Sequence, residues 1–314
     1  MYDTTKPYKK QILELIKQTW NTPYITVKES NPYPIIHKKF LYSEADSVDG
    51  IGTKGMYHWQ QRSFRNAALD ALAMNLNDLV LARARPYKLL DHITIPRDDK
   101  EAVIEIVETL VEECKMRKIA IPGGETSIHE NENTMDISIC ASGWIDYKKE
   151  NNLSGILIGI ASNGLHSNGF TKVRGVFKGE FRTEFIEPTL IYSDLILSLK
   201  DDYNITGMMH ITGGAFTKLK DILKEKNAII HNEHKLKPHS IFYELYEKGI
   251  SDEEMYKIFN CGIGFILSAS KRESKGLVKR IEALGFESDI IGEVIPGKGE
   301  VKISSMFSNK TVDY

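Results

Sequence analysis

The chain has 314 residues, which at about 150 residues per domain predicts two domains or one large one and excludes a small disulfide-stapled protein. Hydrophobic residues make up 41% of the sequence and charged residues 27%, so long stretches of disorder are not expected. The 41 basic and 43 acidic residues give a net charge of −2. The composition therefore lacks the basic excess that is typical of proteins that bind nucleic acids or anionic membranes.

The cysteines indicate a reducing compartment. Cys114, Cys140 and Cys261 are widely spaced and form no CxxC pair, so neither a disulfide framework nor a cysteine metal site is predicted. No stretch approaches the roughly 18 apolar residues of a membrane span, and residues 1–10 lack the apolar core of a signal peptide. We therefore expect a cytoplasmic protein without a membrane or nucleic-acid partner.

The first half of the chain mixes predicted helices and strands. Residues 67–80 (AALDALAMNLNDLV) are apolar on nearly every side and predict a buried helix. Residues 98–118 place apolar side chains at helical spacing, behind acidic residues that suit a helix N-terminus. Apolar and polar residues alternate over 136–143, which is typical of a half-buried strand. The polar run 146–153 (DYKKENNL) predicts a boundary between a domain of residues 1–148 and one of residues 149–314.

The second half begins with a short apolar strand at 156–161. Helices are predicted at 216–226 and 241–248, and a possible capping box at 251–254 precedes a further helix. The segments 264–269, 271–284 and 289–295 then predict a strand, a helix and a strand. Both halves mix the two kinds of element without an internal repeat, so the predicted fold class is α/β or α+β.

Three motifs imitate known sites. Residues 50–55 fit GxGxxG, but the residues before them are short and polar, unlike the buried parallel strand of a dinucleotide site. Residues 292–299 (GEVIPGKG) imitate a phosphate loop, yet a strand-like sequence follows them, which favours a hairpin turn. The histidines within 231–239 lie in a polar, lysine-rich stretch without metal-ligand spacing, so we expect a surface loop there.

Polar groups in the predicted buried helix point to chemistry. Asp70 and Asn77 share one helical face, and Asn75 and Asp78 share a neighbouring one. They could bond to the backbone, or they could line a site, since burying them unpaired is costly. Five glycine-rich turns carry further polar side chains, at 49–54 (DGIGTK), 122–126 (PGGET), 162–169 (SNGLHSNG), 210–216 (HITGGAF) and 260–264 (NCGIG).

Carboxylates, hydroxyls and a lysine beside flexible glycines suit metal and phosphate oxygens. The turn at 210–216 also opens a predicted helix, whose N-terminus favours an anion. Together, the five turns predict a magnesium-nucleotide site.

These elements, in this order, resemble the phosphoribosylformylglycinamidine cyclo-ligase family, also called aminoimidazole ribonucleotide (AIR) synthetases, from about residue 47 to residue 294. The matching segments are DGIGTK at 49, NDLV at 77, GGET at 123, ASNGLHSNGF at 161, PTLIY at 188, HITGGAF at 210 and FNCGIGF at 259. The first three are shared with a wider ATP-binding superfamily that includes selenophosphate synthetase, thiamine-monophosphate kinase and a hydrogenase maturation factor. The last three favour the cyclo-ligase.

The resemblance implies an N-terminal ATP-binding domain whose sheet pairs across a homodimer, and a C-terminal α/β domain. It implies a ligase of purine biosynthesis that uses ATP and Mg²⁺. In the implied reaction, ATP phosphorylates the formyl oxygen of formylglycinamidine ribonucleotide, the ribosyl-bearing nitrogen attacks that carbon, and phosphate leaves as the imidazole ring closes. Phosphoryl transfer of this kind depends mainly on positioning and charge neutralisation.

The resemblance also implies roles for individual residues. The catalytic set is Asp49, Asp78, His166 and His210, and the metal set is Asp49, Asp78 and Glu125. His166 and His210 could bind the substrate phosphate or polarise the formyl oxygen, and the sequence does not separate these roles. Contacts to ATP or to phosphate are implied for Gly50, Gly52, Thr53, Lys54, Asn77, Gly123, Gly124, Thr126, Ser167, Asn168, Thr212, Gly213 and Gly214.

The N-terminal stretch departs from the family pattern. A YKDAG-like segment is reduced to Tyr8–Lys10, residues 31–40 (NPYPIIHKKF) lack the glycines of the family's ATP-closing loop, and Leu190 stands where arginine is common. Lys9, Lys38 or Lys39 could supply phosphate contacts instead. Two alternatives stay open: another ATP-dependent phosphorylating enzyme of the superfamily, and a nucleotide-binding homologue without catalysis.

Overall fold

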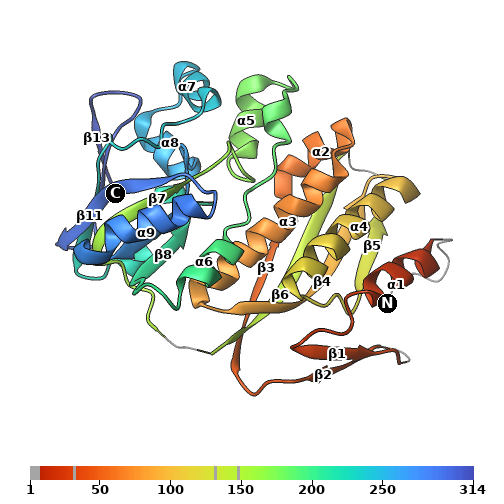
Figure 1. Cartoon of the computed structure of the whole chain (residues 1–314). Helices are drawn as coiled ribbons and strands as arrows, with labels where there is room; N and C mark the ends of the chain where they lie inside the picture. The colour runs from red at the N-terminus through yellow and green to blue at the C-terminus, as the bar shows by residue number, and fades with distance from the viewer. Residues whose placement is uncertain (1–7, 31–32, 131–132, 147–148) are drawn as a thin grey trace. The chain divides into compact units, whose positions relative to one another are not determined.

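A computed structural model describes residues 8–30, 33–130, 133–146 and 149–314. The chain divides into two compact units, residues 1–148 and 149–314, and the division falls within the polar run 146–153 (Figure 1). Most of the N-terminal ten residues, which bear on the signal-peptide prediction, lie outside the described residues, as do two positions in each of the segments 31–40 and 146–153.

The first unit is built on a four-stranded sheet. Its strand order is β3 (Ser43–Gly50), β6 (Asp136–Ile145), β4 (Arg85–Ile95) and β5 (Gly124–Ile128). β6 is antiparallel to both neighbours, whereas β4 and β5 are parallel. The smaller elements are α1 (Lys9–Lys17), the hairpin of β1 (Ile25–Lys28) and β2 (Ile35–Lys38), the 3₁₀ turns η1 (Gly52–Lys54) and η2 (Val80–Ala82), and α2 (Gly55–Gln61).

Two helices cover one face of this sheet, α3 (Phe64–Leu79) and α4 (Lys100–Arg117) (Figure 1). Both confirm the predicted helices, and the Asp99 carboxylate caps α4 by accepting a hydrogen bond from the Ala102 N–H at 3.0 Å. The predicted alternation in β6 is confirmed too, because Ile137 and Ile139 are fully buried beneath the helices.

The second unit contains a seven-stranded sheet. The strand order is β13 (Thr311–Asp313), β12 (Val301–Ser304), β9 (Lys226–Ile230), β11 (Ser288–Pro296), β7 (Gly155–Ala161), β10 (Ile263–Ala269) and β8 (Gly207–His210). All neighbouring strands are antiparallel except β9 and β12. The helical elements are α5 (Phe170–Phe177), η3 (Thr183–Phe185), α6 (Ser193–Leu199), η4 (Ala215–Ile222), α7 (Ser240–Glu247), α8 (Asp252–Ile258) and α9 (Lys271–Ala283).

Most predicted elements of this unit are confirmed, including the N-cap of α8, where the Ser251 hydroxyl accepts a hydrogen bond from the Glu254 N–H. The helix predicted at 216–226 is wrong in type and length. It is a 3₁₀ helix that ends at Ile222, and β9 begins at Lys226. Phe216 and Leu219 are three residues apart and both are buried, a spacing that 3₁₀ geometry places on one line, and the left-handed Lys224 (φ 55°) follows the helix.

The hairpin predicted at 292–299 is also wrong. β9 lies between β11 and β12, so this turn crosses the beginning of β9 instead of joining paired neighbours. The N–H groups of Gly297 and Gly299 donate to the carbonyls of Glu225 and Lys226 there. The prediction that residues 292–299 are not a phosphate loop is consistent with the structure, because a strand, β12, follows the turn instead of a helix.

Two further sequence expectations need correction. The 122–126 turn is shorter than predicted, because Gly124 already lies in β5. Residues 231–239 form a largely exposed loop, as predicted, but His234 within it is only 7% exposed. The next two residues hold it against the sheet, because the Lys235 N–H donates to Asp289 in β11 and Leu236 packs at Gly159 in β7. Within the described ranges, no helix is both long enough and apolar enough to cross a bilayer.

Candidate active site

The loop after β3 holds the first predicted site residues. The Gly50 N–H donates to Oδ1 of Asp49 at 2.8 Å, and the N–H groups of Ile51 and Gly52 both donate to Oδ1 of Asp136 at 3.1 Å. Sequence reasoning missed Asp136 as a site residue, although its position at the start of the alternating strand 136–143 was visible. The amides that the sequence assigns to phosphate are therefore bonded to carboxylates in this structure.

Helix α3 fixes the start of this loop through Asn75. Its Nδ2 donates to the Asp49 carbonyl at 3.1 Å and to the Ala71 carbonyl at 2.9 Å, and its Oδ1 accepts from the Ser47 hydroxyl. Asn75 therefore bonds mainly to the backbone, which is one of the two roles that the sequence left open. Asn77 is fully buried on the same helix, and Asp78 is partly exposed.

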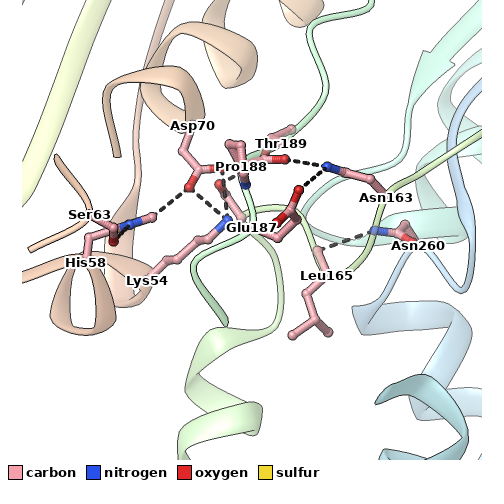
Figure 2. A network of polar contacts seen from close by, with 11 residues as sticks. Lys54, His58, Ser63, Asp70, Asn163, Leu165, Glu187, Pro188, Thr189 and Asn260 are labelled. Carbon is pink, nitrogen blue, oxygen red and sulfur yellow. Dashed lines mark hydrogen bonds and ion pairs between the residues drawn. The ribbon is translucent and has the colours of Figure 1, made fainter. Parts of the chain in front are cut away.

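The end of the loop is held by a buried ion pair. Figure 2 shows the Lys54 ammonium and the His58 ring converging on the Asp70 carboxylate, all three side chains being fully buried. The Lys54 Nζ lies 2.8 Å and the His58 Nε2 also 2.8 Å from Asp70 Oδ2, and the Ser63 hydroxyl lies 2.8 Å from His58 Nδ1.

Electrostatics fixes the charge states in this network. Burial alone would raise the pKa of the Asp70 carboxyl, but the Lys54 ammonium and the His58 N–H outweigh it and hold that pKa well below its usual range. Burial lowers the pKa of the His58 imidazole, although Asp70 opposes this effect. The network thus contains a charged Lys–Asp pair and a neutral imidazole whose proton lies on Nε2, because a carboxylate can only accept.

Sheet register places the predicted metal ligand Glu125 away from Asp49. Asp49 pairs with Ile139, whereas Glu125 pairs with His92, which pairs with Ser138. Neighbouring residues of a strand point to opposite faces, so the carboxylates of Asp49 and Glu125 lie on opposite faces of the sheet.

Asp91 lies in the same cross-strand row as Asp49, and sequence reasoning missed it. It is 5% exposed, and its Oδ1 would lie 2.4 Å from a Cβ at Gly124, so Gly124 makes room for a carboxylate. Thr126, two residues on, is buried on that same face, while Gly123 precedes the strand with open space around it. Among the described residues, no three His, Cys, Asp or Glu side chains are grouped as a preformed metal site.

In the second unit, Asn260 organises the loop 162–169. Its Oδ1 accepts from the Ser162 hydroxyl at 2.8 Å and from the Gly262 N–H at 2.9 Å. Its Nδ2 donates to the Gly164 carbonyl at 2.8 Å and to the Leu165 carbonyl at 3.3 Å, and Figure 2 shows Asn260 beside Leu165. Asn260 is fully buried, so one side chain joins two of the predicted glycine turns.

The two predicted histidines lie in one aromatic cluster. The Tyr192 ring centroid is 6.1 Å from that of His166 and 6.2 Å from that of His210, and both histidines are almost completely buried. A Cβ at Gly264 would lie 2.0 Å from the Tyr192 Oη and 2.7 Å from the His166 Cε1, so glycine is required for this approach. Burial raises the pKa of the Tyr192 phenol well above its ordinary value, and the phenol donates to the Ala161 carbonyl at 2.6 Å.

The remaining predicted residues of this unit flank the cluster. The Ser167 and Thr189 hydroxyls are 3.0 Å apart, and the Thr212 hydroxyl is 2.9 Å from Nζ of Lys218, which sequence reasoning missed. Asn168 is 6% exposed, and its Nδ2 has no hydrogen-bond partner among the described residues. Gly213 and Gly214 form an exposed turn before η4.

The N-terminal lysines considered as phosphate contacts already have local partners. Lys38 pairs with Glu44, and Lys39 Nζ bonds to the Asn21 side chain at 3.1 Å and to the Thr22 carbonyl at 2.8 Å. The side chain of Lys9 lies outside the described residues.

Comparison with known proteins defines the class. Family models described as "AIR synthase related protein, N-terminal domain" and "AIR synthase related protein, C-terminal domain" match residues 42–145 and 155–304. Among solved structures, Escherichia coli HypE, a hydrogenase maturation protein, has a TM-score of 0.71 at 15% identity, covering 98% of this chain and 96% of that one. A HypE in complex with ATP has a TM-score of 0.69 at 12% identity, covering 99% and 95%. The fold is therefore that of the AIR synthase-related proteins.

Relatives with an assigned function identify one family within this class. A phosphoribosylformylglycinamidine cyclo-ligase from Saccharolobus solfataricus is 32% identical over 302 residues, which cover 93% of this chain and 90% of that protein. The cyclo-ligase from Clostridium perfringens is 35% identical over 268 residues, 80% of each chain. The chain belongs to the phosphoribosylformylglycinamidine cyclo-ligase family.

Proposed function

We propose that the chain closes formylglycinamidine ribonucleotide to aminoimidazole ribonucleotide in purine biosynthesis, converting ATP to ADP and phosphate. The observation that supports this most strongly is the 32% identity to a cyclo-ligase over 93% of the chain. The family models match residues of both units, 42–145 and 155–304. HypE represents the alternative, another function within the wider superfamily. It is only 15% identical to this chain, and this likeness shows a common fold alone.

The chemistry explains why ATP is consumed. An amide oxygen is a poor leaving group until it is phosphorylated. The ribosyl-bearing nitrogen then attacks the formyl carbon, and the oxygen leaves with the phosphoryl group as inorganic phosphate. Such a transfer needs positioned charge more than covalent catalysis. One structural neighbour is a HypE in complex with ATP, which supports nucleotide binding by this fold.

His166 and His210 are the proposed substrate-binding residues of the second unit. Their common neighbour Tyr192 holds them in one buried cluster, and the buried Asn168 amide, which lies in the loop 162–169 with His166, offers N–H donors to a ligand. We assign Ser167, Thr212, Gly213 and Gly214 to phosphate contacts around the cluster.

In the first unit, Asp49 and Asp78 are the proposed carboxylates for Mg²⁺, which would neutralise phosphate charge when bound. Mg²⁺ usually keeps several waters and uses one or two carboxylates with substrate phosphates, so a preformed cage of three protein ligands is not required. Because Glu125 points to the opposite sheet face from Asp49, we do not assign those two to one ion. Gly50, Gly52, Thr53, Lys54, Asn77, Gly123, Gly124 and Thr126 form the proposed surroundings of the nucleotide.

Phosphate release from ATP and Mg²⁺, measured with and without formylglycinamidine ribonucleotide, tests this function. The wild-type chain should release phosphate only with the substrate, and Asp78→Asn should lower the rate at least about a hundredfold because a charged group at the phosphates is lost. The exposed Glu108→Gln variant is the matched control and should keep its activity. Retained activity in Asp78→Asn would remove Asp78 from the site, and wild-type protein that binds ATP without substrate-dependent release would be a nucleotide-binding homologue.

The proposal includes a homodimer and a cytoplasmic location. Val48, Cys140 and Leu90 lie in one cross-strand row on the sheet face opposite α3, and Val48 and Leu90 are 73% and 42% exposed. A second copy would cover this apolar row. Val48→Lys should shift the mass measured by light scattering from dimer to monomer, whereas Met116→Lys, at an exposed site on α4, should not. A monomeric wild-type chain would refute the dimer.

A further inference from the structure

A buried network joins Lys54 of the nucleotide loop to His58 and Asp70, two residues to which the proposed chemistry assigns no role. Lys54, His58 and Asp70 are each 0% exposed, and a lysine and an aspartate that are buried together lose favourable hydration. Such a pair is stable only with good geometry and additional hydrogen bonds. His58 supplies one of these bonds to the carboxylate, and Ser63 in turn bonds to His58.

The position of His58 follows from local geometry. Lys54 ends η1 and His58 lies four residues later in α2, a spacing that brings two side chains to the same side of a helical segment. Both therefore reach the Asp70 carboxylate on α3. A Cβ at the intervening Gly55 would lie 1.9 Å from the Met135 carbonyl oxygen, so glycine allows α2 to start this close to the sheet.

The nucleotide loop 49–54 is held at three points. Asn75 bonds to the carbonyl of Asp49, Asp136 holds the two N–H groups in the middle, and Asp70 holds Lys54 at the end. The first two anchors bond to the backbone. The third anchor acts through the long, flexible side chain of Lys54. The position of the Asp70 carboxylate therefore sets the position of Lys54 at the end of the loop.

We propose that His58 and Asp70 are positioning residues for the nucleotide: they fix the Lys54 ammonium and thereby the loop that presents Asp49. This proposal rests on the proposed use of ATP at this loop. A catalytic role for the Ser63, His58 and Asp70 chain itself does not fit, because Lys54 already neutralises Asp70 and the imidazole is completely buried.

Two substitutions of His58 distinguish a role in positioning the nucleotide loop from a role in the stability of the fold alone. His58→Leu removes the hydrogen bond to Asp70, whereas the side-chain amide of His58→Gln can take the place of the Nε2–H donor. We expect His58→Leu to raise the KM and the Kd for ATP about tenfold while the KM for the ribonucleotide substrate stays within twofold, and we expect His58→Gln to restore ATP affinity to within about threefold. Phe64→Leu is the control, because Phe64 is equally buried in the same region and contacts Trp59 without a polar bond.

ATP affinity is measured by calorimetry at a temperature where thermal scans show each variant folded. A lower Tm with unchanged ATP affinity in His58→Leu would overturn the proposal, as would an equal loss of affinity in Phe64→Leu. If His58→Leu does not fold, Ser63→Ala, which removes the outer hydrogen bond at a partly exposed site, should weaken ATP binding two- to fivefold, and no change would overturn the proposal. Calorimetry does not require turnover, so a chain that binds ATP but releases no phosphate would refute the cyclo-ligase function and still test the role of His58.

Discussion

Asn260→Ala should destabilise the second unit more than any ordinary surface change. The Asn260 side chain makes three hydrogen bonds of 2.8–2.9 Å and a fourth of 3.3 Å, all within a site that is 0% exposed. Alanine removes these bonds and leaves the Gly262 N–H and the Gly164 carbonyl buried without this partner. Each buried polar group left without a hydrogen bond costs about 1–3 kcal/mol, so we expect the free energy of unfolding to fall by about 3–5 kcal/mol. This is a large part of the unfolding free energy of about 5–15 kcal/mol that is typical of a domain.

Urea unfolding followed by far-ultraviolet circular dichroism measures this loss. Fluorescence is unsuitable, because Trp20, Trp59 and Trp144 all lie in the first unit. Asn232→Ala is the control: among the described residues, the side chain of this exposed asparagine makes one hydrogen bond, of 3.1 Å to the Ser305 carbonyl, and its loss should cost under about 1 kcal/mol. A similarly small loss in Asn260→Ala would refute the inference that one side chain holds both loops.

Two further predictions concern the same unit. Burial, assisted by Lys237, lowers the pKa of His234 to about 4, so the folded chain binds fewer protons than the unfolded chain as the pH falls from 6.5 toward 4, and stability falls through that window. Urea unfolding of wild type should lose about 2 kcal/mol more than His234→Gln between pH 7 and pH 4.5, and equal losses would contradict this account. Gly264→Ala should abolish substrate-dependent phosphate release, because its Cβ would collide with Tyr192 and His166, whereas Gly175→Ala, with no atom within 4 Å of the added Cβ, should be active. An active Gly264→Ala would show that the cluster tolerates displacement.

Local sequence patterns predicted much of the fold correctly. The all-round apolar run at 67–80, the helical spacing at 98–118 and the alternation at 136–143 each became the expected element, because burial of an apolar face depends mainly on periodicity within one segment. The 216–226 segment failed because its type depends on packing of Phe216 and Leu219 against the rest of the unit. Propensity is overruled there by tertiary contacts.

The candidate site shows the same division. The glycine turns at 162–169 and 260–264 were visible in the sequence, but the hydrogen bonds that join them through Asn260 link positions almost a hundred residues apart. The sequence likewise marked Asp70 as a polar residue that needs a partner, without identifying that partner. Lys54 and His58 fill this role only because α2 and α3 pack together.

The sequence by itself determined most of the helices and strands, the positions of the glycine-rich turns and the membership in the cyclo-ligase family, since motif order and periodicity depend only on the order of residues along the chain. Only the tertiary structure decided that β9 separates β11 from β12, that Glu125 and Asp49 face opposite sides of a sheet, and that Asp136 accepts hydrogen bonds from the Ile51 and Gly52 N–H groups. Strand order, sheet face and charge pairing depend on residues distant in sequence, whose contacts are chosen by burial and electrostatics of the whole unit.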